Sequence, residues 1–265
     1  MINWNSFLSS PEIPLMRKSL VPLAVLVAYL VLSPECPVAG APQKKAPQRN
    51  NDFDPTSAYV KKRIEDWNVL VNKRLLEKEH KELCEKTLKL LGDHLFRISR
   101  VVPAKALAKL RKVPIWVEVA HPEHACMCYH VSAGWLRDHG MNPEKAGAVE
   151  LANARNFLSW TVQQPWMVLH ELAHAYHHQF LGFGHAGVRA CYKRAVESKS
   201  YVSVLHINGR KERAYALTND KEYFAEASEA FFGTNDFYPF VRAELKQHDP
   251  KMYALLEKVW GVRKR

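Results

Sequence analysis

Residues 166–178 read W-M-V-L-H-E-L-A-H-A-Y-H-H, and the H-E-x-x-H pattern at their centre contains His170, Glu171 and His174. Positions i and i+4 of an α-helix lie on one face, so His170 and His174 can point at the same metal ion. Zinc binds neutral imidazole nitrogens and favours tetrahedral coordination. Glu171 follows the first of these residues, where its carboxylate can take a proton from a zinc-bound water. The stretch therefore predicts a helix that carries two zinc ligands and a general base.

The residues around this pattern favour a buried helix. The neighbours of the histidines are apolar, and Pro165 suits the first turn of a helix. The alternative is a core helix whose two histidines only form hydrogen bonds. The apolar neighbours are Val168, Leu169, Leu172 and Ala173.

A catalytic zinc site needs a third protein ligand and a position left open for water. The metzincin pattern H-E-x-x-H-x-x-G-x-x-H does not supply it, because His177 stands at the glycine position and Phe180 at the last histidine position. The other common source is a glutamate from a later helix. Residues 215–227, Y-A-L-T-N-D-K-E-Y-F-A-E-A, are the candidate stretch.

Residues 166–178 and 215–227 together resemble the zinc-binding half of the anthrax lethal factor catalytic domain and the related Pro-Pro endopeptidases. In that group, Y-x-x-T-N-x-x-E-[FY]-F-A-E-A lies downstream of H-E-x-x-H. The resemblance implies that Glu222 is the third zinc ligand and that Tyr215 donates a hydrogen bond in the transition state. It also implies that Glu226, one turn further on, is an acceptor behind the ligands. The resemblance therefore implies a metallopeptidase that binds one zinc ion per chain. We expect an endopeptidase rather than an exopeptidase, and the resemblance does not specify the side chains of the substrate.

Each of these three residues also has a purely structural interpretation. Glu222 lies three residues after Asn219 and could close an N-terminal capping box. Tyr215 could be a strand aromatic packed on the core, and Glu226 a solvated helix carboxylate. The fixed spacing downstream of H-E-x-x-H favours the functional interpretation of all three together.

The expected fold is α+β: a compact zincin-like domain with a small twisted sheet, the zinc-binding helix and a helical C-terminal part. Asn208-Gly209 predicts a hairpin turn, whose second strand would end at Tyr215 near the Glu222 helix. Asp249-Pro250 divides two C-terminal helices. The remaining hydrophobic patterns predict strands at residues 67–71 and 114–119, and helices at residues 75–101, 103–112 and 186–200.

Residues 148–157 precede the zinc helix, where gluzincins commonly place an edge strand that binds extended peptide through its backbone. Asn153 and Ala154 resemble the start of that substrate-binding strand in thermolysin-like enzymes. The alternative is an ordinary core strand or loop.

Residues 121–130, H-P-E-H-A-C-M-C-Y-H, are dense in histidine and cysteine and could bind a second metal, although the spacing matches no common zinc knuckle. Disulfides are the favoured interpretation, because removal of a leader would leave an even number of cysteines in an exported chain. Sequence does not choose the partners among Cys84, Cys126, Cys128 and Cys191.

Residues 1–40 are predicted to be a signal peptide. Arg17 and Lys18 precede an apolar run at residues 20–32, and small residues allow cleavage before Ala41. Translation starting at Met16 would give a more typical leader, and an uncleaved anchor is the alternative. Residues 41–55 are polar and proline-rich, typical of a disordered linker, so the folded domain is expected at residues 56–265. The sequence thus predicts a secreted, periplasmic or cell-envelope protein.

The 265 residues are 47% hydrophobic and carry a net charge of +11. This hydrophobic content allows a sizeable core. Lysines and arginines are spread along the chain and no nucleic-acid-binding motif is present, so a solvated basic surface is expected rather than a nucleic-acid site. A membrane partner is not expected after leader removal, and the sequence does not indicate an oligomeric state.

The function predicted from these observations is secreted, zinc-dependent hydrolysis of peptide bonds, with peptide or protein as the substrate. Two alternatives remain: a zinc-binding module without catalysis, and a zinc hydrolase of a non-peptide amide. The intact Glu171 argues against the first, because a purely structural zinc site needs no general base.

Overall fold

The computed structural model of the chain describes residues 53–121 and 124–262. The predicted signal peptide and all of the predicted linker up to residue 52 lie outside the described residues. Within them, Asp54 forms an ion pair with Arg74 of 2.6 Å and accepts a hydrogen bond of 2.8 Å from Asn72. The folded domain therefore includes the last residues of the predicted linker. No helix in the described ranges is both long and apolar enough to cross a membrane.

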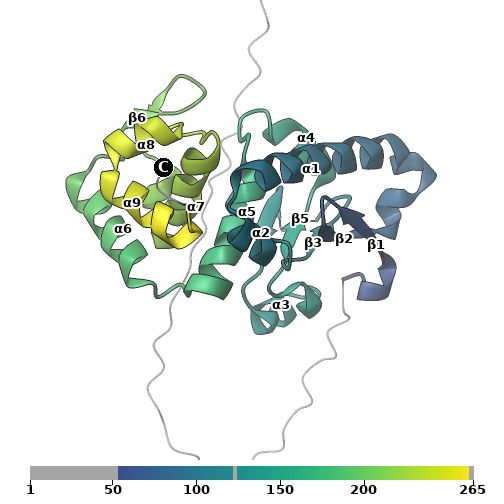
Figure 1. The fold of residues 1–265 in the computed structure, drawn as a ribbon. Coiled ribbons are helices and arrows are strands. Elements are labelled where there is room, and N and C mark those ends of the chain that lie inside the picture. Colours follow the sequence, from purple (N-terminus) through teal and green to yellow (C-terminus); the bar gives the residue numbers. More distant parts are fainter. Residues whose placement is uncertain (1–52, 122–123, 263–265) are drawn as a thin grey trace, which may run out of the picture. The chain divides into compact units, whose positions relative to one another are not determined.

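A five-stranded mixed sheet forms one part of the domain (Figure 1). Its order is β1-β2-β3-β5-β4, with β2, β3 and β5 parallel and the two outer strands antiparallel to their neighbours. The strand predicted at residues 67–71 is confirmed as β2, and Trp67, Val69 and Val71 are fully buried in it. The strand bounds are β1 (Tyr59–Ile64), β2 (Trp67–Asn72), β3 (Ile115–Val117), β4 (Met127–Tyr129) and β5 (Val149–Leu151).

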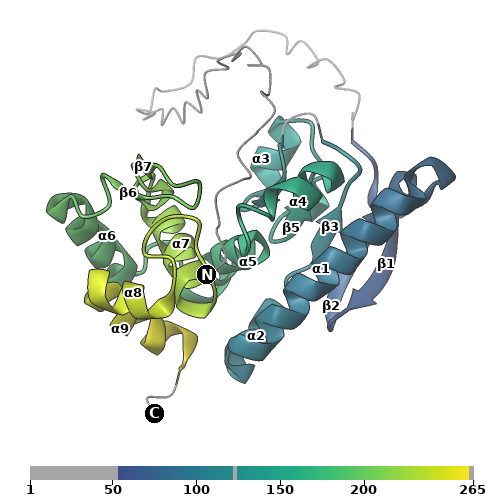
Figure 2. The same ribbon diagram turned by 90° about the horizontal axis from the view of Figure 1, so that it is seen from above.

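Helices cover the sheet and form the C-terminal part of the domain (Figures 1 and 2). The helix predicted at residues 75–101 begins only at Lys81, because the preceding residues form short 3-10 turns, the first capped by the side chain of Asn72. The predicted α+β class agrees with this mixture. The helix bounds are α1 (Lys81–Val101), α2 (Ala104–Leu110), α3 (Ala133–Asp138), α4 (Ala154–Trp160), α5 (Met167–Tyr176), α6 (Ala186–Ser198), α7 (Asp220–Phe232), α8 (Arg242–His248) and α9 (Pro250–Trp260).

Helix α7 is the centre of the C-terminal part. Every residue from Tyr223 to Phe232 is buried, and the helix packs against α5, α6, α8 and α9. The predicted division between α8 and α9 is confirmed: the Asp249 side chain accepts a hydrogen bond from the Met252 backbone, and Pro250 is the first residue of α9. Since α5 also packs against β4, α1 and α2, it joins the sheet to the helical part.

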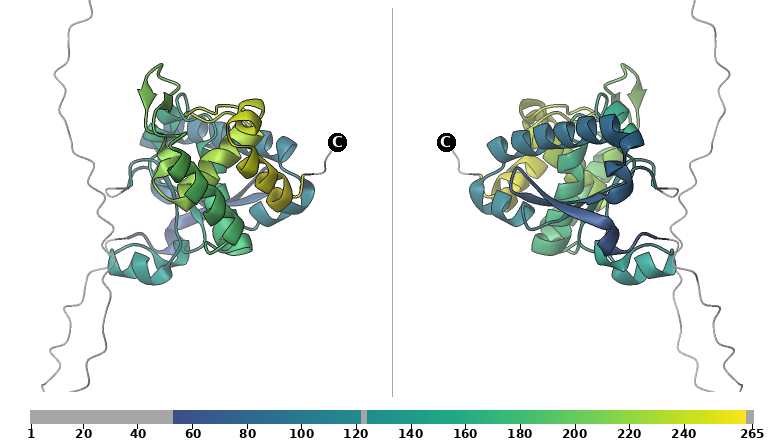
Figure 3. Two further views of the ribbon diagram at one scale, coloured as in Figure 1. Left: turned by 90° about the vertical axis from the view of Figure 1, so that its left-hand side faces the viewer. Right: turned by 90° about the vertical axis from the view of Figure 1, so that its right-hand side faces the viewer.

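The hairpin predicted at Asn208-Gly209 is present but short, and it projects from the helical part (Figure 3). Its strands are β6 (Val204–Leu205) and β7 (Lys211–Glu212), and Gly209 has a φ of +85°. The second strand ends before Tyr215, which instead begins a 3-10 turn, η6 (Tyr215–Leu217). The prediction that Tyr215 ends a strand was therefore wrong, although it lies close in sequence to both the hairpin and α7.

A buried polar network joins the strands of the sheet. The Tyr59 hydroxyl donates to Glu118 Oε1 at 2.5 Å, and the Lys145 Nζ contacts the same oxygen at 2.7 Å. Lys145 also contacts Glu150, whose other oxygen lies 2.5 Å from His130 Nε2. Burial raises the pKa of Glu150, but its contacts with His130 and Lys145 outweigh burial and lower that pKa to about 2. The network thus links β1 to the residue that follows β4.

The disulfide prediction is not borne out within the described ranges, where all four cysteines are free thiols. They lie on separate elements and have other contacts. Cys84 is on α1, Cys126 has its Sγ 3.6 Å from the Met167 sulfur, and Cys191 on α6 accepts a hydrogen bond from Arg194. An even number of cysteines therefore did not indicate pairing.

Candidate metal centre

His170 and His174 lie one turn apart on α5, as the sequence predicted, with ring centroids 4.7 Å apart. The helix forms because a continuous apolar run surrounds them, and eight of its ten residues are buried. The two rings consequently emerge from one face of a helix that is otherwise part of the core.

Glu222, in the first turn of α7, faces both histidines. Its Oε2 lies 3.0 Å from His170 Nε2 and 3.2 Å from His174 Nε2. Two imidazole nitrogens and a carboxylate oxygen thus converge, with all three donor atoms within 4.8 Å of one another. Ligands at about 2.0–2.2 Å from zinc in a tetrahedral site are separated by roughly 3.3–3.5 Å, which is close to these distances. The donor set therefore fits a zinc ion with one position open.

The start of α7 accounts for the position of Glu222. The Asn219 side chain accepts hydrogen bonds from the backbone of Lys221 and Glu222, at 2.9 and 3.0 Å, and so caps the helix. The Glu222 carboxylate does not return to that cap but faces the histidines of α5. Asn219 is therefore a helix cap, and Glu222 is a candidate ligand rather than its capping-box partner.

A residue that the sequence interpretation missed lies behind His170. The Nδ1 atom of His170 is 2.7 Å from Glu229 Oε1, but 3.9 Å from Glu226 Oε1. Glu226 instead accepts a hydrogen bond of 3.1 Å from Asn235. The prediction that Glu226 is the acceptor behind the ligands is thus corrected to Glu229. Both share a helix face with Glu222, at i+4 and i+7, so spacing alone could not separate them.

The charges of this cluster depend strongly on one another. Burial raises the pKa of Glu222, but hydrogen bonds from the two histidines outweigh it and lower that pKa overall. Burial lowers the pKa of His170, and its contacts with Glu222 and Glu229 reverse the direction. Burial also raises the pKa of Glu229 to about 7 and that of Glu226 well above its usual value. Buried carboxylates held beside imidazoles are the surroundings in which a bound dication is favourable.

Glu171 and Tyr215 line the same cleft as the candidate ligands, and this cleft has a volume of about 860 Å³. The ring of Tyr215 lies 6.4 Å from that of His170, and 49% of the residue is exposed. Burial of its hydroxyl end, followed by the charge of Glu222, raises the pKa of Tyr215 to about 12. The phenol therefore remains a hydrogen-bond donor at neutral pH. Sequence reasoning did not identify the other residues of the cleft, which include Trp160, Phe183, His206, Arg213, Lys221 and Phe237.

The edge strand beside the cleft is β4, not the predicted stretch at residues 148–157. Strand β5 lies inside the sheet between β3 and β4, whereas β4 is terminal, packs against α5 and contributes cleft residues. Asn153 caps α4 by accepting a hydrogen bond from Asn156, and Ala154 is the first, fully buried residue of that helix. The predicted substrate-strand role of Asn153 and Ala154 was therefore wrong.

The two histidines that follow the motif are not brought into the ligand set. His177 is fully buried between the rings of Phe183 and Phe224, and burial lowers its pKa to about 4. The Nδ1 of His178 is paired with the Tyr129 hydroxyl at 2.8 Å. Both lie where α5 continues as a π-helical turn, His177–Leu181, which is followed by Gly182.

No family model matches this chain, and no curated protein or solved structure matches it either.

Proposed function

We propose that this protein is a zinc-dependent peptidase of the zincin type, with His170, His174 and Glu222 as the metal ligands. The observation that carries the proposal is that one Glu222 oxygen lies 3.0 Å from His170 Nε2 and 3.2 Å from His174 Nε2. These residues come from two helices distant in sequence, and a core helix with hydrogen-bonded histidines does not require a cleft at that point. The sequence resemblance described above supports the same assignment.

When bound, zinc supplies Lewis-acid activation of water and substrate carbonyl. Glu171 lines the cleft next to the first ligand and acts as the general base: it accepts a proton from the attacking water and later delivers it to the leaving amine. Tyr215 donates a hydrogen bond to the carbonyl oxygen as negative charge develops on it. Glu229 accepts the Nδ1 proton of His170 and so directs Nε2 toward the metal.

The substrate class that we propose is an extended peptide aligned on β4. A terminal strand presents backbone donors and acceptors that an added strand can pair with. Since β4 pairs with β5 on one side and contributes side chains to the cleft, a peptide added to it would pass the ligands on α5. We propose endopeptidase activity on peptides or proteins outside the cytoplasm, in keeping with the predicted leader.

The experiment that tests this function uses the full chain, purified with zinc, against three substrate sets: a mixed peptide library, peptidoglycan and small amides. Peptide cleavage that is abolished by a chelator, restored by zinc and absent from Glu171→Gln protein is the expected result. Cleavage confined to small amides or peptidoglycan would support a non-peptide amide hydrolase. Zinc binding without turnover of any set would support the non-catalytic module.

A further inference from the structure

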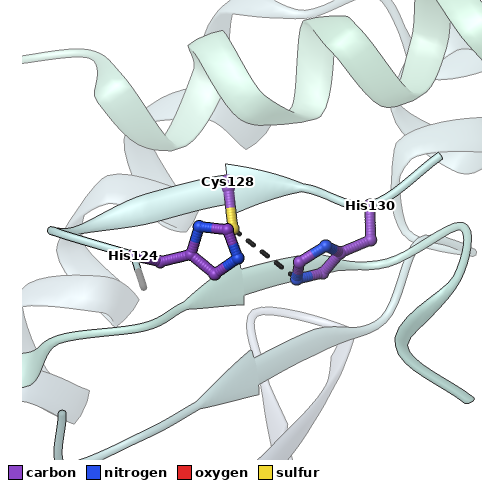
Figure 4. Close-up of side chains that lie close together, drawn as sticks. All are labelled: His124, Cys128 and His130. Carbon is purple, nitrogen blue, oxygen red and sulfur yellow. Dashed lines mark hydrogen bonds between the residues drawn. The ribbon is translucent and has the colours of Figure 1, made fainter. Parts of the chain in front are cut away.

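Three side chains of the histidine- and cysteine-rich stretch lie close together at β4 and face one another (Figure 4). They are His124, Cys128 and His130. Their donor atoms all lie within 4.8 Å of one another, and Cys128 Sγ is 3.5 Å from His130 Nε2. Cys128 belongs to β4, His130 follows that strand directly, and His124 precedes it. The group shares no residue with His170, His174 and Glu222.

One donor of this group has no partner. The Nε2 atom of His124 is buried and has no hydrogen-bond partner within the described ranges. Its ring is held between His121 and His130, with centroid distances of 5.0 and 5.5 Å. Buried polar atoms are nearly always satisfied by protein, water or an ion, so an imidazole nitrogen left alone beside a thiol and a second imidazole points to a missing ligand.

The buried network contacts His130 at Nε2, the same nitrogen that faces Cys128. Its Nε2 lies 2.5 Å from Glu150 Oε2, and Glu150 is fully buried with its other oxygen on Lys145. A cation bound at this nitrogen replaces the hydrogen bond to Glu150, and the carboxylate oxygen then lies next to the ion. Because Lys145 holds the opposite oxygen, the carboxylate stays in place when that exchange occurs.

We propose that His124, Cys128 and His130 bind a second transition-metal ion, with Zn²⁺ as the metal that this donor set fits. One thiolate and two imidazoles form a common zinc ligand combination, and softer thiolate donors disfavour Mg²⁺ and Ca²⁺. Cys128 loses its thiol proton to solvent when the metal–sulfur bond forms. The Glu150 oxygen or a water molecule supplies the fourth donor.

We infer a structural role for the second metal ion from its position at β4. The ion fastens the residues before β4 to the strand and to the residue after it. Since β4 is a wall of the catalytic cleft, this site holds the strand on which we propose that peptides align. His124 and Cys128 line the same cleft as the H-E-x-x-H residues, but the two candidate metal groups share no ligand. The assignment of the second ion therefore does not depend on the proposed peptidase activity.

The decisive experiment is cobalt substitution of the full chain, because only a cysteine ligand gives a thiolate-to-cobalt charge-transfer absorption in the near ultraviolet. His170, His174 and Glu222 contain no sulfur, so that band reports on the second site alone. We expect the band in the unmodified protein and in His170→Ala, and its loss in Cys128→Ser. The matched control, Cys191→Ser, removes a buried cysteine of α6 and should keep the band.

Zinc content measured by elemental analysis gives an independent result. The unmodified protein should hold two zinc ions per chain, Cys128→Ser and His170→Ala one each, and the double variant none. A single zinc per unmodified chain, together with cobalt protein that lacks the thiolate band, would overturn the second site without touching the first. The second site would also be overturned if His170→Ala lost zinc while Cys128→Ser kept the zinc content of the unmodified protein.

Discussion

His170 is held from both sides of its ring: Nε2 lies 3.0 Å from Glu222 Oε2, and Nδ1 lies 2.7 Å from Glu229 Oε1. Both carboxylates come from α7, two turns apart on one face. The same helix therefore supplies a candidate ligand and the group that orients another ligand. A histidine whose Nδ1 proton is taken by a carboxylate presents Nε2 to a metal in one fixed tautomer and direction.

Glu229→Gln should lower zinc affinity by about 10–100-fold, because partners of this kind typically contribute that much. Glu226→Gln is the matched control: it changes a buried carboxylate on the same helix that lies 3.9 Å from His170. We expect it to have the smaller effect. Competition with a chelator of known affinity measures both variants, and equal losses in the two would contradict the assignment of Glu229.

Glu222→Ala should lose most of its zinc affinity while the fold persists, since α7 is held by its apolar face and by the Asn219 cap. Asp220→Ala, in the same helical turn, removes an ion pair of 3.7 Å with Arg189 and should keep its zinc. Elemental analysis and circular dichroism check the pair. Because we also propose a zinc ion at Cys128, the loss of zinc in Glu222→Ala is measured in a Cys128→Ser background, which lacks that second ion. Unchanged affinity in Glu222→Ala would reject it as a ligand.

Glu171→Gln should retain zinc and lose turnover. The substitution keeps the size and shape of the side chain but removes the basic oxygen that accepts the water proton. Zinc content and peptide hydrolysis, measured on the same preparation, provide the check. If the variant is fully active, water is not activated by the proposed route.

Tyr215→Phe should lower kcat by about 10²–10³, with KM, zinc content and Tm nearly unchanged, because it removes one donor to the oxyanion. With its pKa raised to about 12, the phenol stays a donor across the ordinary assay range. Tyr192→Phe is the control, since its hydroxyl donates to the Leu217 carbonyl of the same 3-10 turn without lining the cleft. Normal turnover in Tyr215→Phe, with damage only in Tyr215→Ala, would make Tyr215 a packing residue.

His94 should make stability depend on pH. It is 4% exposed on α1, and burial, with Arg97 nearby, lowers its pKa to about 4, whereas Asp93 acts in the opposite direction. In the unfolded chain His94 takes up a proton near pH 6.5, whereas in the folded chain it does so only near pH 4. The stability that the neutral, buried His94 gives to the fold is therefore fully present above pH 6.5 and is lost as the pH falls toward 4. The loss is about 3 kcal/mol in the free energy of unfolding.

Urea denaturation at several pH values tests this dependence. His94→Leu should flatten the fall in unfolding free energy between pH 6.5 and 4, apart from any constant change in stability. The exposed His139→Gln should leave the slope as it is. A slope that His94→Leu does not change would assign the pH dependence to other groups.

The sequence predicted the parts of the site that depend on local spacing. His170 and His174 need only one helical turn, and Glu222 was singled out because residues 215–227 resemble the downstream pattern of the lethal factor group. Glu229 could not be chosen over Glu226, because the choice depends on how α5 and α7 cross. Strand β4 was missed for a similar reason: three residues carry little periodicity, and their strand character comes from pairing with β5.

The buried polar network of the sheet also affects how much conformational entropy β4 loses when a peptide binds to it. Terminal strands usually fray, opening and closing on their own. Here a chain of hydrogen bonds and ion pairs runs from Tyr59 on one outer strand, through Lys145 and Glu150, to His130 beside the other. Opening β4 therefore disrupts the buried contact between His130 and Glu150, which ties its opening to that of the whole domain. A peptide that aligns on a strand already ordered in this way loses less conformational entropy on the protein's side, so more of its contact energy is expressed as affinity.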